Sequence, residues 1–103
     1  MINEMMGNEA AFQRLQKWYK SQCNGDWEHS FGIKIETLDN PGWIVTIDLS
    51  DTEWESITLD RKISERSDQD WVQYEIANNQ FIGCGGSNNL IEIINLFFQV
   101  IDS

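Results

Sequence analysis

The residue types best suited to chemistry lie in one short stretch, residues 23–32, and in a second cysteine far along the chain. The stretch holds Cys23 and the only histidine, His29, and Cys84 supplies the second thiol. A thiolate beside an imidazole can act as a nucleophile, and the two groups are also zinc ligands. However, Cys-x5-His is not a zinc-binding spacing, and the chain contains no CxxC pair. A small metal- or thiol-dependent enzyme or binder that uses Cys23, His29 and Cys84 is therefore the alternative hypothesis.

Acidic residues are the other functional feature of the sequence. Asp26 and Glu28 alternate within the same stretch, so in an extended segment they would point the same way. Two carboxylates on one side suit general acid–base work or an edge that faces a partner. Tryptophan is enriched where partners bind most tightly, and Trp54 lies within a second acidic run. We expect the partner-binding residues to be Asp26, Glu28, Asp39, Asp51, Glu53, Trp54 and Glu55.

The charge of the chain narrows the class of partner. Seventeen acidic residues against seven basic ones give a formal net charge of -10. Nucleic acid and anionic membrane surfaces need cationic groups, so we expect neither as a ligand. A basic protein partner fits better, because opposite charge steers the encounter, although an acidic surface also simply keeps a small protein soluble. The N-terminus lacks the pattern of a secretory signal, and two unpaired cysteines suit a reducing cytoplasm, where we expect the protein to act.

Two amphipathic helices must frame these residues. A first helix, capped by Asn8, places Phe12, Leu15, Trp18 and Tyr19 on one apolar stripe. A C-terminal helix follows Asn89, whose spacing to Glu92 is that of a capping box. Its apolar stripe consists of Leu90, Ile93, Ile94, Phe97 and Ile101. Ile91, Phe98 and Val100 widen this stripe, which indicates deeper packing than that of the first helix.

Alternating apolar residues between the helices predict five strands. Residues 31–49 read as a hairpin around Pro41-Gly42, in which the proline and glycine suit a type II turn. A third strand lies near residues 57–63, and Asn78-Asn79 suit the tight turn between the last two. The glycines of residues 83–86 read as a flexible joint before the last helix. Residues 1–103 are therefore expected to form one α+β domain: a five-stranded antiparallel meander with the N-terminal and C-terminal helices packed on one face.

One long pattern resembles a known family. It runs Trp18-Tyr19-x-x-Gln22-Cys23-x-Gly25-Asp26-Trp27-Glu28-His29-x-Phe31-Gly32-Ile33-x-Ile35, followed by Thr37-Leu38-Asp39-Asn40-Pro41-Gly42-Trp43. This pattern is similar to the immunity protein 53 family of bacterial polymorphic toxin systems. The residues of the pattern that we expect to be structural are Gly25, Trp27, His29, Gly32, Pro41, Gly42 and Trp43.

The resemblance implies a function as well as a fold. It implies a small cytoplasmic protein that is encoded beside a toxin and neutralises the toxin's catalytic domain by binding it. Many such toxins are nucleases with basic grooves, which an acidic inhibitor can occupy. The resemblance implies no enzymatic activity and no cofactor. We expect a monomer or a weak dimer, and a scaffold that self-associates through an exposed sheet face is a third possibility.

Overall fold

A computed structural model describes the backbone of residues 2–102 and the side chains of residues 10–102. The elements, in chain order, are α1 (Ile2–Gln22), α2 (Trp27–Ser30), β1 (Ile33–Leu38), β2 (Gly42–Asp48), β3 (Leu59–Glu65), β4 (Trp71–Ala77), β5 (Gln80–Gly85) and α3 (Leu90–Ile101). None of the described helices has the length and hydropathy that a membrane-spanning helix requires.

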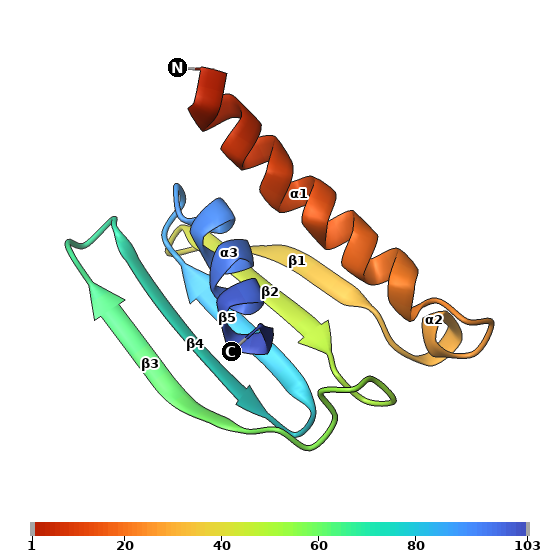
Figure 1. Ribbon diagram of the computed structural model, residues 1–103. Helices are drawn as coiled ribbons and strands as arrows, with labels where there is room; N and C mark the ends of the chain where they lie inside the picture. Colours follow the sequence, from red (N-terminus) through yellow and green to blue (C-terminus); the bar gives the residue numbers. More distant parts are fainter. Residues whose placement is uncertain (1, 103) are drawn as a thin grey trace.

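The strands form one antiparallel sheet, and α1 and α3 pack on the same face of it (Figure 1). The α+β class and the five strands are therefore confirmed. The meander order was wrong, because the strands lie in the order β1-β2-β5-β4-β3. The β4–β5 hairpin inserts beside β2, so the chain from β2 to β3 crosses one end of the sheet. The alternation of apolar and polar residues shows which side chains of a strand lie on each face of the sheet, but it does not show which strands are neighbours. The sequence therefore did not reveal this order.

Helix α1 is longer than expected, and its buried stripe is narrower. It begins at Ile2, so the prediction that Asn8 caps it was wrong. Ala11, Leu15 and Trp18 are buried at a helical spacing. Phe12 and Tyr19, which were expected on the apolar stripe, remain 40% and 41% exposed.

The first hairpin pairs β1 with β2 in an unbroken register from Ile33↔Ile47 to Leu38↔Gly42. Its turn is not of type II: the Asn40–Pro41 peptide bond is cis, and Gly42 does not have a positive φ. Gly42 is needed for a different reason. A Cβ at this position would lie 2.3 Å from the backbone oxygen of Gly85, on the neighbouring strand β5.

The β4–β5 hairpin contains one confirmed prediction and one error. Asn78 and Asn79 have φ values of 54° and 61°, as a tight hairpin turn requires. The glycines that follow were expected to form a flexible joint, but β5 continues through Gly83 to Gly85. A Cβ at Gly83 would lie 2.6 Å from Cγ2 of Ile93, so glycine allows α3 to pack directly on the central strand.

The core lies between α3 and the sheet. Helix α3 buries one apolar side, and its Phe97 makes edge contacts with Trp18 and Phe81 at ring-centroid distances of 5.1 and 5.2 Å. Asn89 precedes this helix but makes no side-chain capping bond, so the predicted capping box was wrong. Its amide instead donates to Asp70 and Glu92. The buried residues of the core are Ala11, Leu15, Trp18, Trp27, Val45, Ile47, Leu49, Val72, Ile76, Phe81, Ile93, Ile94, Phe97, Phe98 and Ile101.

Candidate partner-binding surface

The connection between α1 and β1 is a loop that contains the short helix α2 and is held by side-chain-to-backbone hydrogen bonds. The side-chain oxygen of Asn24 accepts from the backbone N–H groups of Asp26 and Trp27, both at 2.9 Å. The Glu28 carboxylate accepts from the N–H groups of Asn24 and Gly25 at 2.9 and 2.8 Å. Because α2 is helical, Asp26 and Glu28 do not project together, as an extended segment would have required. Glu28 turns back into its own loop, whereas Asp26 is exposed.

Hydrogen bonds to backbone N–H groups favour the ionised form of Glu28. The N–H of Glu28 itself is the largest influence, those of Asn24 and Gly25 add to it, and together they lower the pKa of the Glu28 carboxyl. The charge of the neighbouring His29 acts in the same direction. Glu28 therefore carries a stable negative charge while it holds the loop. The bracing comes from Asn24, which the sequence analysis did not single out, and the His29 side chain is exposed.

Trp27 ties this loop to a second one. Its side chain is 2% exposed and lies 6.0 Å from the rings of Trp18 and Tyr19. Its ring N–H donates to the backbone oxygen of Ser50 at 3.0 Å. Ser50 lies near the start of the segment that leads from β2 to β3, so one buried indole fixes two loops that are distant in sequence.

The second loop, residues 49–58, carries the acidic run. The Glu55 carboxylate accepts from the N–H of Asp51 at 2.7 Å, where the backbone has a φ of 60°. Trp54 is half-buried: its ring lies 5.9 Å from that of Trp18, and its N–H donates to the backbone oxygen of Ile101 at 3.1 Å. Trp54 thus attaches the loop to the end of α3 and to α1.

The β4–β5 turn completes this end of the sheet. The backbone oxygen of Asn79 accepts from the N–H of Leu49 at 2.7 Å. Its side-chain oxygen accepts from the N–H of Ser56 at 2.8 Å. Sequence reasoning assigned Asn79 to the turn alone. A turn signal does not reveal a contact with a loop more than twenty residues earlier in the chain.

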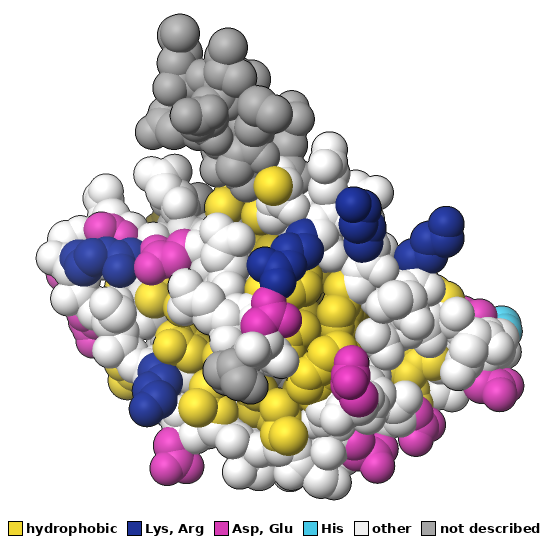
Figure 2. Space-filling view, in the orientation of Figure 1, with side chains coloured by type: hydrophobic (Ala, Val, Ile, Leu, Met, Phe, Trp, Pro, Cys, Tyr) yellow, Lys and Arg dark blue, Asp and Glu magenta, His cyan; other side chains and the backbone are white. Residues whose placement is uncertain are grey.

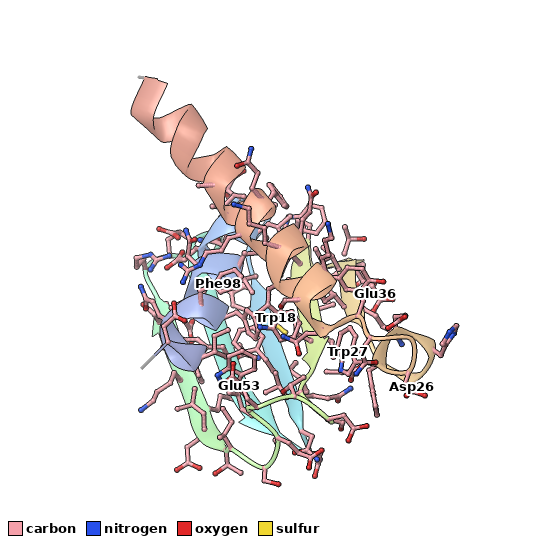
Figure 3. The ribbon with its side chains drawn as sticks, turned by 45° about the vertical axis from the view of Figure 1, so that its right-hand side comes forward. Trp18, Asp26, Trp27, Glu36, Glu53 and Phe98 are labelled. Atoms are coloured by element: carbon pink, nitrogen blue, oxygen red, sulfur yellow. The ribbon has the colours of Figure 1, made fainter. Side chains whose placement is uncertain are left out.

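These connections gather five acidic residues at one end of the sheet, which we call the acidic end: Asp26, Glu28, Asp51, Glu53 and Glu55. Residues 21–33 and 49–60 contain no lysine or arginine. Acidic side chains gather at the lower right of the molecule, where no lysine or arginine is visible (Figure 2). Asp26 and Glu53 lie at this same end, on either side of Trp27 (Figure 3).

The arginines of the chain neutralise acids elsewhere. Within the described residues, Arg14 pairs with Asp102, Arg61 pairs with Glu75, and Arg66 pairs with both Asp70 and Glu92. None of these partners belongs to the acidic end. The negative charge of this end is therefore left for solvent, ions or a partner.

Asp39 is separated from the other predicted residues. It lies in the β1–β2 turn at the opposite end of the sheet, where a cavity of about 370 Å³ is lined by residues 40, 41, 68, 69, 71 and 87. Trp43 anchors this end as Trp27 anchors the other, by donating its ring N–H to the backbone oxygen of Ser87 at 3.0 Å. The structure therefore does not bring Asp39 together with Asp26, Glu53 and Trp54.

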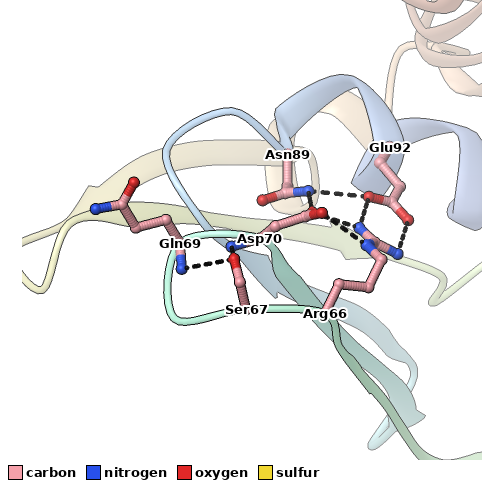
Figure 4. Close-up of polar contacts among 6 residues, drawn as sticks. All are labelled: Arg66, Ser67, Gln69, Asp70, Asn89 and Glu92. Atoms are coloured by element: carbon pink, nitrogen blue, oxygen red, sulfur yellow. Dashed lines mark hydrogen bonds and ion pairs between the residues drawn. The ribbon is translucent and has the colours of Figure 1, made fainter.

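A hydrogen-bonded ion network fixes the β3–β4 loop onto α3 at this opposite end (Figure 4). Arg66 donates to Asp70 at 2.7 Å and to Glu92 at 2.6 Å, and Asn89 donates to the same two carboxylates. Arg66 first, and Asn89 second, lower the pKa of the Asp70 carboxyl to about 2. Sequence reasoning missed the network, because Arg66 and Asp70 are separated from Asn89 and Glu92 by about twenty residues of chain.

The thiol and imidazole groups are not assembled into a site. Cys84 lies in β5 with Gln73, Arg61 and Glu75 nearby, whereas Cys23 lies at the end of α1 and bonds to the Tyr19 backbone oxygen. Among the described side chains, no group of three His, Cys, Asp or Glu is arranged to hold a metal ion. Burial raises the pKa of the Cys84 thiol, which disfavours the nucleophilic thiolate. The geometry gives the alternative hypothesis no support.

Comparison with known proteins gives one finding. Residues 12–102, nearly the whole chain, match the family model described as immunity protein 53. No curated protein and no solved structure matches the chain.

Proposed function

Because the chain belongs to the immunity protein 53 family, we propose that it binds the catalytic domain of a cognate bacterial toxin and neutralises it as a stoichiometric inhibitor. Family membership carries the proposal. It supports a role in immunity, and the exposed carboxylates of the acidic end indicate how the protein would bind the toxin.

The acidic end is the surface that we assign to the toxin. Asp26, Asp51 and Glu53 are exposed there, and none of them has an ion-pair partner among the described residues. Like charges held close together repel one another until a cationic partner neutralises them, so a basic surface gains from docking here. Glu28 and Glu55 add their charge while their oxygens hold the loops.

The acidic end is also preorganised. Its two loops are held by backbone hydrogen bonds, by two indole N–H donors and by the side chain of Asn79. A surface that is already ordered loses less conformational entropy when it binds. A toxin therefore meets these carboxylates in fixed positions.

The charge favours a nuclease as the toxin. A nuclease binds the phosphate backbone of its substrate with lysine and arginine side chains, and the same cations can pair with carboxylates of an inhibitor. By occupying such a groove, the protein would exclude nucleic acid without any chemical step. We propose that this takes place in the cytoplasm, where newly made toxin would otherwise reach its substrate.

Co-expression with the toxin domain that is encoded beside this protein tests the proposal. We expect the two proteins to co-purify in equal amounts and the cells to survive. A monodisperse, folded protein that neither binds this toxin domain nor rescues cells that express it would refute the proposed function.

A further inference from the structure

The two edges of the sheet differ in their ability to accept another strand. At the β3 edge, the pairing with β4 shifts register between Leu59 and Lys62, and an irregularity of this kind protects an edge from further pairing. The β1 edge has no such defence, because β1 pairs with β2 in regular register along its whole length. Ile35, Lys34 and Glu36 of β1 are all exposed.

Backbone geometry shows which groups of β1 point outward. The N–H of Asp48 donates to the oxygen of Gly32, directly opposite, at 3.1 Å. Because bonded and non-bonded pairs alternate in an antiparallel ladder, Lys34 and Glu36 also bond toward β2. The N–H and C=O groups of Ile33, Ile35 and Thr37 therefore face away from the sheet. No strand of the described chain lies beyond β1.

The sequence of β1 is complementary to itself. If two copies pair antiparallel around a two-fold axis at Ile35, then Lys34 of each copy lies opposite Glu36 of the other. Ile35 lies opposite Ile35, and Ile33 lies opposite Thr37, so all the outward-facing backbone groups find partners. The Lys34–Glu36 positions are then the non-bonded pairs, at which opposing side chains come closest.

Neighbouring registers lack this complementarity. An axis at Lys34 would place Lys34 opposite Lys34, and an axis at Glu36 would place Glu36 opposite Glu36. Like charges directly opposite each other disfavour pairing. The charges of β1 thus select one register for a second copy, whereas a lone lysine on an edge strand would only block association.

Exposed apolar side chains lie along the same edge. Ile35 is 37% exposed on the helix-covered side of the sheet, and Tyr19 of α1 is 41% exposed. Tyr19 lines an open cavity of about 340 Å³ together with Leu15, Gln16, Gly32 and Ile33, where α1 meets the beginning of β1. Figure 3 places Glu36 at this edge of the molecule. A second copy would cover Ile35 with its own Ile35.

We propose that β1 pairs with β1 of a second copy around a two-fold axis at Ile35, so that two five-stranded sheets become one continuous sheet. The seam is one short strand from each copy, smaller than a standard interface of roughly 1,600 Å². Association is therefore weak and depends on concentration. The proposal does not depend on toxin binding, because it uses a different surface.

Analytical ultracentrifugation from low to high micromolar concentration tests the pairing. We expect a reversible monomer–dimer equilibrium in the wild-type protein. Lys34→Glu and Glu36→Lys each create two like-charge pairs in the dimer, and each should weaken dimerisation about tenfold. The double variant K34E/E36K restores both opposite-charge pairs and should restore the dimer. Lys62→Glu makes the same change of charge on the β3 edge and should have no effect.

A backbone variant gives an independent check. Ile35→Pro removes an N–H that faces away from β2, so the fold should persist while the dimer is lost. A wild-type protein that stays monomeric throughout the concentration range refutes the proposal, as does a dimer that is unchanged by K34E, E36K and I35P. A monomer whose toxin affinity falls on Lys34→Glu would also refute it, and would assign this edge to the toxin. Failure of toxin binding alone leaves the dimer measurement intact.

Discussion

Replacing the Trp27 indole should loosen the acidic end while leaving the fold in place. Trp27→Phe retains an aromatic ring in the core but removes the N–H that donates to Ser50 at 3.0 Å. The Ser50 oxygen then loses its partner in a half-buried position, which costs about 1–2 kcal/mol. Trp27→Ala also loses the buried ring, so its cost should be about 3–5 kcal/mol, a large part of the stability of a domain of this size.

Trp43→Phe is a matched control for this change. It removes the same kind of bond, an indole N–H to the backbone oxygen of Ser87 at 3.0 Å, at the opposite end of the sheet. Urea unfolding should show the midpoint lowered by about 1 M for Trp27→Phe. The loss should be smaller for Trp43→Phe, because Ser87 is exposed and water can replace the lost donor. Only Trp27→Phe should also weaken toxin binding, by about tenfold, because only this variant frees the loops of the acidic end.

Two results would refute this reasoning. If Trp27→Phe leaves the urea midpoint unchanged, then the bond to Ser50 does not stabilise the fold. If the two variants weaken toxin binding equally, then the loss reflects general destabilisation rather than the geometry of the acidic end.

Three further predictions concern the core, the opposite end and the thiols. Gly83→Ala should destabilise the protein by about 1–3 kcal/mol in urea unfolding, because its Cβ would lie 2.6 Å from the Ile93 side chain. Gly32→Ala is the control and should be nearly neutral, because a Cβ there would meet no atom within 4 Å. Equal effects of the two substitutions would contradict this explanation. The pKa of the Asp70 carboxyl, about 2, lies below its ordinary value of about 4, so this carboxylate stabilises the fold above pH about 4 and the stabilisation is lost as the pH falls toward 2. Asp70→Asn should therefore be less stable than wild type at pH 5, with a difference that narrows by pH 2; a constant difference would exclude ionisation as its cause. Since burial raises the pKa of the Cys84 thiol, iodoacetamide should label Cys84 more slowly at pH 8 than it labels a free cysteine. The double variant C23S/C84S should still protect cells from the toxin. Loss of protection in a folded double variant would instead support the thiol hypothesis.

Local patterns in the sequence predicted most of the secondary structure. The alternation of residues 31–49 gave the first hairpin, Asn78-Asn79 gave the last turn, and the apolar stripe of the C-terminal helix gave its deep packing. Each of these signals depends on residues that are close together in the chain. Backbone dihedral preferences and burial periodicity are properties of this local scale.

Contacts between residues far apart in the chain could not be predicted from these local patterns. The glycines at 83 and 85 continue a strand because α3 packs on them, and no local rule separates this use from a flexible joint. The position of β5 beside β2 likewise depends on the whole sheet. The same holds for the candidate surface. The sequence identified the acidic residues, but only the fold shows that Asp26 lies near the acidic residues of the 51–55 segment and that Asp39 lies at the other end of the sheet.

The central claim is that the acidic end binds the toxin, and calorimetric titration of the toxin domain tests it most directly. D26N/D51N/E53Q neutralises three exposed carboxylates that hold no loop in place, and D39N/E65Q/D68N removes the same charge from exposed acids nearer the opposite end. The first variant should weaken binding about tenfold or more, with a smaller dependence on salt, whereas the second should bind nearly as the wild type does. Unchanged binding by the first variant, or a greater loss in the second, would contradict the account.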